Sequence, residues 1–334
     1  MDNDNIESMG GAGGAGGYGG EGIPDVVTVG EAMALLMARQ PGPLAAVSQF
    51  ERATAGAELN VSVGLSRLGY RVGYVSSLGK DSLGRNLLDF MKAEGIDLRH
   101  LRLDERYPTG FMLKSMALDA SDPEVEYFRR GAAASHMSRA DIPPGPFQQA
   151  RLLHLTGITP ALSGTCRDMA LTMAAQARGA GRIVTFDPNL RPRLWPTQAA
   201  MIETVNALAS LADVVMPGLA EGKLLTGCGE AAGIADFYLA RGARQVVVKL
   251  GPQGAYYAGA EGRGIAPGVP VPLEKVVDTV GAGDGFAVGV ISALLENLPL
   301  AAAAARGNAI GARVVQFRGD CEGLPTRAQL GLRS

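Results

Sequence analysis

The chain has 334 residues, of which 47% are hydrophobic, and its formal net charge is -2. This length allows a large α/β domain with a substantial core, and the balanced charge argues against a nucleic-acid or anionic membrane partner. No apolar run reaches the ~18 residues of a membrane span, and three widely spaced cysteines favour a reducing compartment, so we expect a soluble, cytoplasmic protein.

Residues 1–22 form a glycine-rich segment with an acidic start and no sign of a signal peptide. We expect this segment to be disordered, because it has little apolar surface to bury and much conformational entropy to lose on ordering. Residues 11–16 match the dinucleotide-binding pattern GxGxxG, but no predicted strand precedes them and no helix follows, so we assign them no function. The folded region is expected to span residues 23–330.

Short apolar strands alternate with helical segments through most of the remaining chain. The predicted strands are 26–30, 72–76, 152–155, 183–186, 213–216 and 246–250, and the predicted helices are 57–68, 81–95, 166–180, 201–211 and 286–298. This pattern indicates an α/β fold with a doubly wound, mostly parallel sheet and helices on both faces. Residues 33–50 and 109–130 lack helical periodicity, and we expect them to form a small β-sheet lid.

The segment DTVGAGD, residues 278–284, leads directly into the last predicted helix. Small residues at a helix start leave backbone N–H groups facing outward, in front of the positive end of the helix dipole, and such a start binds anions. We expect the N–H groups of Gly281, Ala282 and Gly283 to hold a phosphoryl group while Asp284 accepts a proton from a hydroxyl. A glycine turn capped by Asp284 for structural reasons alone is the alternative.

A second candidate segment begins at Gly56, which permits close backbone approach, and includes Asn60, whose amide could hold sugar hydroxyls. An ordinary helix start is the alternative reading. The run DTVGAGDGFA resembles the C-terminal signature of the ribokinase-like (PfkB) sugar kinases. GAELN at 56–60, RLG at 67–69 and GKDSLG at 79–84 resemble the N-terminal signature of the same family in order and spacing. The resemblance covers residues 23–330 and implies a ribokinase-like fold that uses ATP and Mg²⁺; whether the protein also uses a monovalent cation stays open.

Three further segments resemble bacterial 2-keto-3-deoxygluconate kinases within that family: EYFRRG at 126–131, DPNLRPRLW at 187–195 and RGDCEG at 318–323. Arg129 and Arg191 could converge on one carboxylate, because guanidinium groups bind carboxylates bidentately. A sugar acid requires such a contact and a neutral hexose does not; two solvated arginines are the alternative. By resemblance, the residues facing the sugar acid would be Gly56, Asn60, Tyr127, Arg129, Arg191, Asp284 and Asp320. Met112 stands where an aromatic contact is expected.

The resemblance also implies a nucleotide site. The residues expected to border ATP are Asp187, Asn189, Lys249, Gly251, Gly254, Gly281, Gly283 and Asn308. The family carries Asn-x-x-Glu beside the metal; here Gly218 replaces the asparagine and Glu221 is retained, so we expect Glu221 to contact Mg²⁺ through water.

We therefore predict a kinase that phosphorylates the terminal C6 hydroxyl of 2-keto-3-deoxygluconate, with Asp284 as the base. A fructokinase, a ribokinase or another PfkB sugar kinase is the first alternative, and an inactive sugar-sensing binder is the second. We also expect a homo-oligomer. His154, in an apolar strand, is expected to be a core residue.

Overall fold

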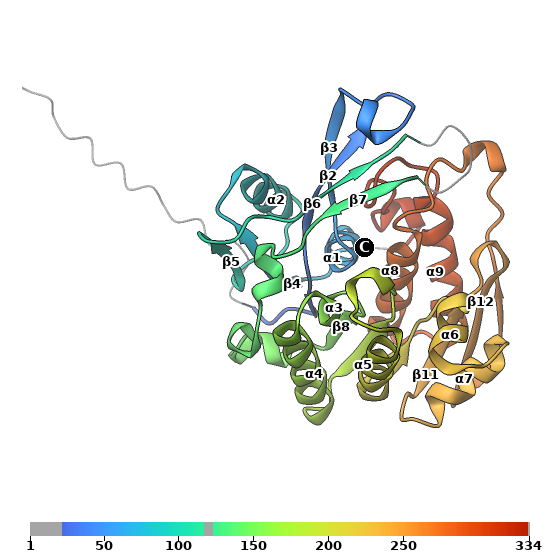
Figure 1. The fold of residues 1–334 in the computed structure, drawn as a ribbon. Helices are drawn as coiled ribbons and strands as arrows, with labels where there is room; N and C mark the ends of the chain where they lie inside the picture. The colour runs from blue at the N-terminus through green and yellow to red at the C-terminus, as the bar shows by residue number, and fades with distance from the viewer. Residues whose placement is uncertain (1–21, 117–122, 333–334) are drawn as a thin grey trace, which may run out of the picture.

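The computed structural model describes residues 22–116 and 123–332, and its strands form two sheets (Figure 1). Within these residues the main sheet has nine strands in the order β13-β12-β11-β10-β9-β8-β1-β4-β5. Neighbours from β5 to β11 are parallel, and β12 and β13 are antiparallel at one edge. The bounds are β1 Val26–Val29, β4 Val72–Gly79, β5 Leu101–Asp104, β8 Leu152–Thr156, β9 Ile183–Asp187, β10 Val214–Val215, β11 Gln245–Lys249, β12 Gly254–Gly259 and β13 Gly262–Pro267.

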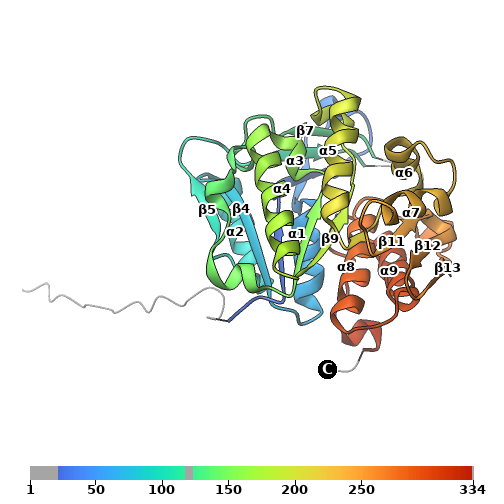
Figure 2. The same ribbon diagram turned by 90° about the horizontal axis from the view of Figure 1, so that it is seen from below.

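Helices cover both faces of this sheet (Figure 2). One apolar core lies beneath α1, α2, α8 and α9, and a second lies beneath α4, α5, α6 and α7. The bounds are α1 Ala57–Arg67, α2 Ser82–Ala93, α3 Thr159–Leu162, α4 Gly164–Gly179, α5 Gln198–Leu211, α6 Leu219–Thr226, α7 Ala231–Leu239, α8 Ala282–Leu295 and α9 Leu300–Val314. The predicted doubly wound α/β fold is confirmed.

The helix that carries the DTVGAGD motif is held by close packing. Most of α8 is buried, and it packs against α9 and α1. A Cβ atom on Gly289 would lie 2.5 Å from the Cα of Gly307, so α8 and α9 approach too closely there for any larger residue. On the other side, a Cβ atom on Gly64 of α1 would lie 2.5 Å from the side chain of Val288. This packing fixes the start of α8 relative to the sheet.

The second sheet has the order β3-β2-β6-β7 and projects from the main body (Figure 1). Its strands are β2 Met33–Ala38, β3 Phe50–Ala55, β6 Phe111–Lys114 and β7 Val125–Phe128. Because only three residues separate β1 from β2, this small sheet lies beyond the carboxyl end of β1. The predicted small sheet is confirmed, although β3 lies almost wholly beyond the range 33–50, because its sequence FERATA alternates too weakly to be recognised.

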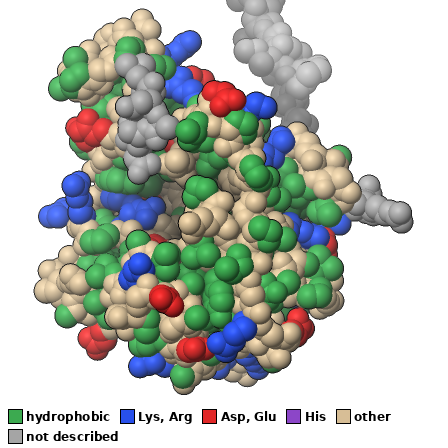
Figure 3. Space-filling view, turned by 90° about the vertical axis from the view of Figure 1, so that its right-hand side faces the viewer, with side chains coloured by type: hydrophobic (Ala, Val, Ile, Leu, Met, Phe, Trp, Pro, Cys, Tyr) green, Lys and Arg blue, Asp and Glu red, His purple; other side chains and the backbone are tan. Residues whose placement is uncertain are grey.

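Several sequence expectations concern the rest of the chain. The tail predicted to be disordered lies outside the described residues, apart from residue 22. None of the described helices combines the length and apolar character needed to cross a membrane. All three cysteines are free. His154 is buried: its Nδ1 lies 3.0 Å from the hydroxyl of Thr185, and burial lowers its pKa to about 3. On the face in Figure 3, acidic and basic side chains are scattered among apolar ones.

Candidate active site

A cleft of about 400 Å³ lies between the small sheet and the carboxyl edge of the main sheet. In open α/β sheets ligands bind at this edge. Most of the residues predicted from sequence line it: Gly56, Asn60, Tyr127, Arg129, Asn189, Arg191, Glu221, Lys249, Gly281, Gly283, Asp284 and Asp320. The predicted residues that do not line it are Asp187, Gly251, Gly254, Ala282 and Asn308.

Asp284 lies in the first turn of α8 and is only 8% exposed. Its Oδ2 accepts a hydrogen bond from Nδ2 of Asn60 at 2.7 Å, and its Oδ1 accepts one from Nδ2 of Asn189 at 3.2 Å. Burial raises the pKa of Asp284 to about 7, the hydrogen bond from Asn60 opposes this, and the nearby carboxylates of Asp187 and Asp320 add to it. A carboxyl group with a pKa near neutrality is suited to general-base catalysis.

The N-terminus of α8 lines this cleft beside Asp284. Gly281 caps the helix with φ 83°, in the left-handed region, and a Cβ atom there would lie 2.4 Å from the carbonyl oxygen of Asp320. Only glycine fits this position without strain. The N–H of Ala282 is directed at the carbonyl of Thr279 at 3.4 Å, within the turn, and Ala282 does not line the cleft. Of the three residues expected to donate N–H groups, Gly281 and Gly283 line the cleft and Ala282 does not.

The two arginines expected to converge on one carboxylate have different surroundings. The guanidinium of Arg129 is buried and bonds Oε2 of Glu31 through Nη2 and through Nε, the latter at 2.6 Å. Its charge is thus already compensated. Arg191 instead donates to the carbonyl of Leu190 at 3.0 Å, and among the described residues no carboxylate lies within ion-pair distance of it. Among the described basic residues of the cleft, Arg191 is therefore the one with no carboxylate within ion-pair distance, although its charge partly offsets the rise in the pKa of Asp284 and of Asp320.

Sequence reasoning missed two buried glutamates of the cleft. Glu58 accepts hydrogen bonds from the hydroxyls of Thr156 at 2.6 Å and Thr159 at 2.9 Å. Burial raises the pKa of both Glu31 and Glu58. Within the described residues, Oε1 of Glu31 and Oε2 of Glu58 have no hydrogen-bond partner. Glu31 could have been predicted as a site residue from its position two residues after β1, because ligand-binding groups follow the carboxyl ends of parallel strands.

Sequence reasoning also missed Lys114. Its ammonium lies 2.5 Å from Oδ2 of Asp278 and 3.2 Å from Oδ1 of Asp320, with all three side chains buried. Lys114 shares the buried face of β6 with Met112, where alternation places apolar residues. A lysine on that face was the sequence signal.

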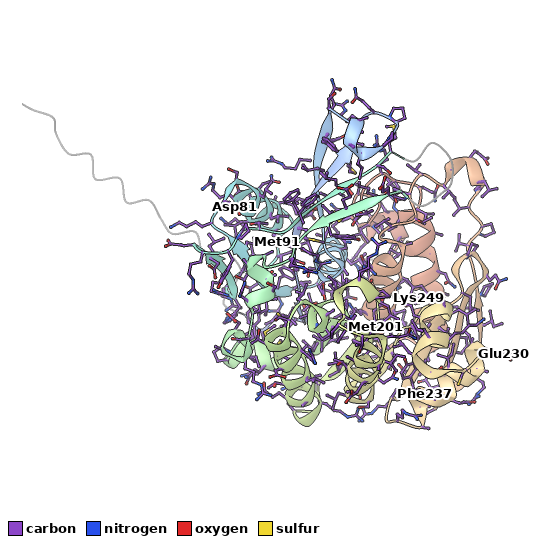
Figure 4. All side chains as sticks on the ribbon, in the orientation of Figure 1. Asp81, Met91, Met201, Glu230, Phe237 and Lys249 are labelled. Carbon is purple, nitrogen blue, oxygen red and sulfur yellow. The ribbon has the colours of Figure 1, made fainter. Side chains whose placement is uncertain are left out.

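The nucleotide side of the cleft is built around Lys249, at the end of β11 and labelled in Figure 4. Its Nζ lies 2.7 Å from Oδ2 of the buried Asp187. Burial would lower the pKa of Lys249, but Asp187 and Glu221 outweigh burial and raise it. Lys249 therefore stays charged, is paired with Asp187 and lies beside Gly283 at the start of α8. Asn308 donates to the carbonyls of Ala266 and Pro267, each at 3.0 Å, so its amide holds the end of β13.

Glu221 lies in the first turn of α6 and accepts two backbone hydrogen bonds. Its Oε2 accepts the N–H of Gly218 at 2.8 Å, and its Oε1 accepts the N–H of Leu190 at 2.7 Å. Within the described residues no cluster of three or more acidic, His or Cys side chains could hold a metal ion directly. Because Mg²⁺ usually keeps several waters, a fixed carboxylate on the cleft wall suits a contact through water.

Comparison with known proteins gives consistent matches along nearly the whole chain. The model of the family described as pfkB family carbohydrate kinase matches residues 24–327. The 2-dehydro-3-deoxygluconokinase of Bacillus subtilis is 50% identical over 92% of this chain and 94% of that protein. The structure of a PfkB protein from Polaromonas sp. JS666 is 51% identical, with a TM-score of 0.86, and covers 93% of this chain and all of that one.

Two more distant structures contain ligands. A protein from E. coli with a TM-score of 0.84 and 25% identity, covering 92% of this chain and 98% of that one, was solved with ATP and Mg²⁺. A fructokinase from Vibrio cholerae with a TM-score of 0.80 and 26% identity, covering 93% and 98%, holds fructose, ADP and a potassium ion.

Proposed function

Because the chain belongs to the PfkB family of carbohydrate kinases, we propose that it is an ATP-dependent sugar-acid kinase that phosphorylates the C6 hydroxyl of 2-dehydro-3-deoxygluconate (2-keto-3-deoxygluconate). The observation that carries the proposal is the position of Asp284. This carboxyl, with a pKa of about 7, lies in the cleft beside a helix start, as deprotonation of an acceptor hydroxyl next to a bound phosphate requires. The relative from Bacillus subtilis supports the choice of sugar acid.

In this mechanism Asp284 accepts the proton of the C6 hydroxyl as its oxygen attacks the terminal phosphorus of ATP, and ADP leaves. Asn60 and Asn189 orient the carboxylate through their two hydrogen bonds. The N–H groups of Gly281 and Gly283 stabilise the negative charge on the transferring phosphoryl oxygens, a contribution of about 2.7–4 kcal/mol per donor in other enzymes. Glu221 would hold Mg²⁺ through water, and the metal ion would supply positive charge that neutralises the phosphates.

Arg191 binds the carboxylate of the sugar acid, because it is the one described cation of the cleft with no carboxylate within ion-pair distance. Arg129 and Tyr127 lie at the same end of the cleft, around the carboxylate of the sugar acid. The guanidinium of Arg129 lies 5.7 Å from the ring centre of Tyr127. Gly56 and Asp320 face the sugar hydroxyls.

On the ATP side, Lys249 and Asn189 contact the nucleotide directly. Asp187 and Asn308 do not line the cleft and act indirectly. Asp187 holds Lys249 in place, and Asn308 holds the end of β13. The turn of Gly251 and Gly254 connects β11 to β12 and shapes the same border. A cytoplasmic location and a homo-oligomeric state stay predictions.

The test is a panel assay with the purified full-length chain, ATP and Mg²⁺. The panel contains 2-dehydro-3-deoxygluconate, its galactonate epimer, fructose and ribose, with ADP release giving kcat/KM and phosphorus NMR giving the phosphorylated position. We expect the two sugar acids to exceed the neutral sugars by about tenfold or more. A neutral ketose as the best substrate would contradict the sugar-acid assignment, and phosphorylation of none would favour the inactive binder.

Arg191 can be tested within the same assay. Arg191→Gln should raise KM for the sugar acid while leaving turnover of a neutral sugar unchanged. Arg193→Gln is the matched control, because Arg193 is exposed and close in sequence. An equal effect of both substitutions would remove the role given to Arg191.

A further inference from the structure

The buried ammonium of Lys114 lies where three separate segments of the chain meet. Lys114 is the last residue of β6 in the small sheet, and its side chain is 4% exposed. Asp278 precedes α8, and Asp320 follows α9 by several residues. The ammonium contacts both carboxylates, at 2.5 Å and 3.2 Å respectively. One lysine therefore joins the small sheet to both segments.

Those two segments surround the N-terminus of α8. Oδ1 of Asp278 accepts the N–H of Val280 at 3.1 Å, so the carboxylate that binds Lys114 also shapes the loop before the helix. The backbone carbonyl of Asp320 lies against Gly281, where a Cβ atom would come within 2.4 Å. The position of Gly281 therefore depends on both segments that the ammonium holds together.

The charges make the ammonium necessary to this arrangement. Asp278 and Asp320 are both buried, and two adjacent buried carboxylates repel each other unless a cation lies between them. Burial lowers the pKa of Lys114, but the two carboxylates outweigh burial and raise it, so the side chain stays charged. A cavity of about 150 Å³ lined by Lys114, Asp278 and Arg318 borders the cluster and leaves space beside the ammonium.

We propose that the Lys114 ammonium is a tethered monovalent cation, which holds Asp278 and Asp320 and thereby fixes Gly281 in the geometry that receives the phosphoryl group. The proposal rests on the kinase function proposed above. Lys114 is a positioning residue, since it acts through the two carboxylates. An enzyme with this built-in cation needs no free K⁺ or NH₄⁺, whereas the same enzyme without the side chain recruits one of them to the vacated position.

The experiment compares the wild type, Lys114→Ala and Lys80→Ala. Lys80 is the matched control, because its ion pair with Glu105 is exposed. Each protein is assayed in choline chloride and then in KCl, NH₄Cl or methylammonium chloride at equal ionic strength, with kcat, KM and thermal unfolding measured. In choline, Lys114→Ala should lose roughly tenfold or more in kcat and about 5 °C or more in Tm. At least one small cation should restore most of both losses, whereas the wild type and Lys80→Ala should not respond.

Four results would overturn the proposal: strong activation of the wild type by K⁺ or NH₄⁺, no rescue of Lys114→Ala by any cation, equal rescue of Lys80→Ala, or a change in KM alone. If Lys114→Ala does not fold, Lys114→Ala combined with Asp278→Asn removes one of the repelling carboxylates and is tested for the same rescue. The unfolding measurement needs no turnover. It therefore tests whether a small cation replaces the Lys114 ammonium even if the wild type phosphorylates no sugar acid and the proposed function fails.

Discussion

Replacing Asp284 by asparagine should stabilise the fold above neutral pH even though it removes the catalytic base. The structure raises the pKa of this carboxyl from 3.8 to about 7. At about 1.36 kcal/mol per pKa unit, this difference corresponds to at most about 4 kcal/mol. The sign follows from the direction: a carboxyl with a raised folded-state pKa contributes stability that is fully present below about pH 4 and is lost as pH rises through 7.

The expected gain is smaller than this limit. Asparagine mimics the protonated acid and can still accept from Asn60, but its amide would place a donor opposite the donor of Asn189. One lost hydrogen bond costs about 0.5–1.5 kcal/mol, so we expect a net gain of about 2–3 kcal/mol at pH 8.5. For a chain of this length that is roughly 3–4 °C in Tm.

The assay is thermal or urea unfolding of the wild type and Asp284→Asn at pH 5 and pH 8.5. We expect the Tm of the variant to exceed that of the wild type at pH 8.5, and the gap to shrink at pH 5. Asp168→Asn, at an exposed position of α4, is the control and should show no such pH dependence. If Asp284→Asn is destabilised equally at both pH values, the carboxylate carries no burial penalty and the reasoning is wrong.

Three further substitutions test the surroundings of this carboxylate. Asn60→Ala removes the hydrogen bond that lowers the pKa of Asp284. Because kcat should increase with pH as Asp284 loses its proton, the midpoint of that increase should move up by about one pH unit; an unchanged midpoint would contradict this. Gly281→Ala forces a side chain into a left-handed position against backbone, and unfolding experiments should show a loss of about 1–3 kcal/mol together with reduced kcat. Glu31→Gln removes the carboxylate that is ion-paired with the buried guanidinium of Arg129 and should cost about 3–5 kcal/mol in urea unfolding, whereas a neutral effect would show that Arg129 does not depend on this ion pair.

The fold and the centre of the candidate site could be predicted because their signals are local. Fully buried strands such as β1 and β8 are mostly apolar runs, interrupted by Thr28 in β1 and by His154 in β8. The start of α8 is a contiguous motif whose residues need no distant partner to be recognised.

What the sequence did not predict depends on distant pairs. Glu31 and Arg129 are separated by 98 positions, and Lys114 and Asp320 by 206, so no local pattern joins either pair. Arg129 forms an ion pair with Glu31, whereas Arg191 has no described carboxylate within ion-pair distance, and no local pattern distinguishes the two arginines in this respect. The direction of the backbone N–H groups could not be predicted from sequence either. The turn before α8 directs the N–H of Ala282 at the carbonyl of Thr279 rather than into the cleft.

The most direct test of the account is the turnover of Asp284→Asn on 2-dehydro-3-deoxygluconate, with sugar affinity measured by calorimetry on the same protein. A base that takes the hydroxyl proton typically contributes 10²–10⁴-fold, so kcat should fall by about that factor while the dissociation constant of the sugar changes by only about threefold or less. A variant that keeps kcat within about twofold of the wild type would show that the proton goes elsewhere, and would contradict the assignment of Asp284 as the base.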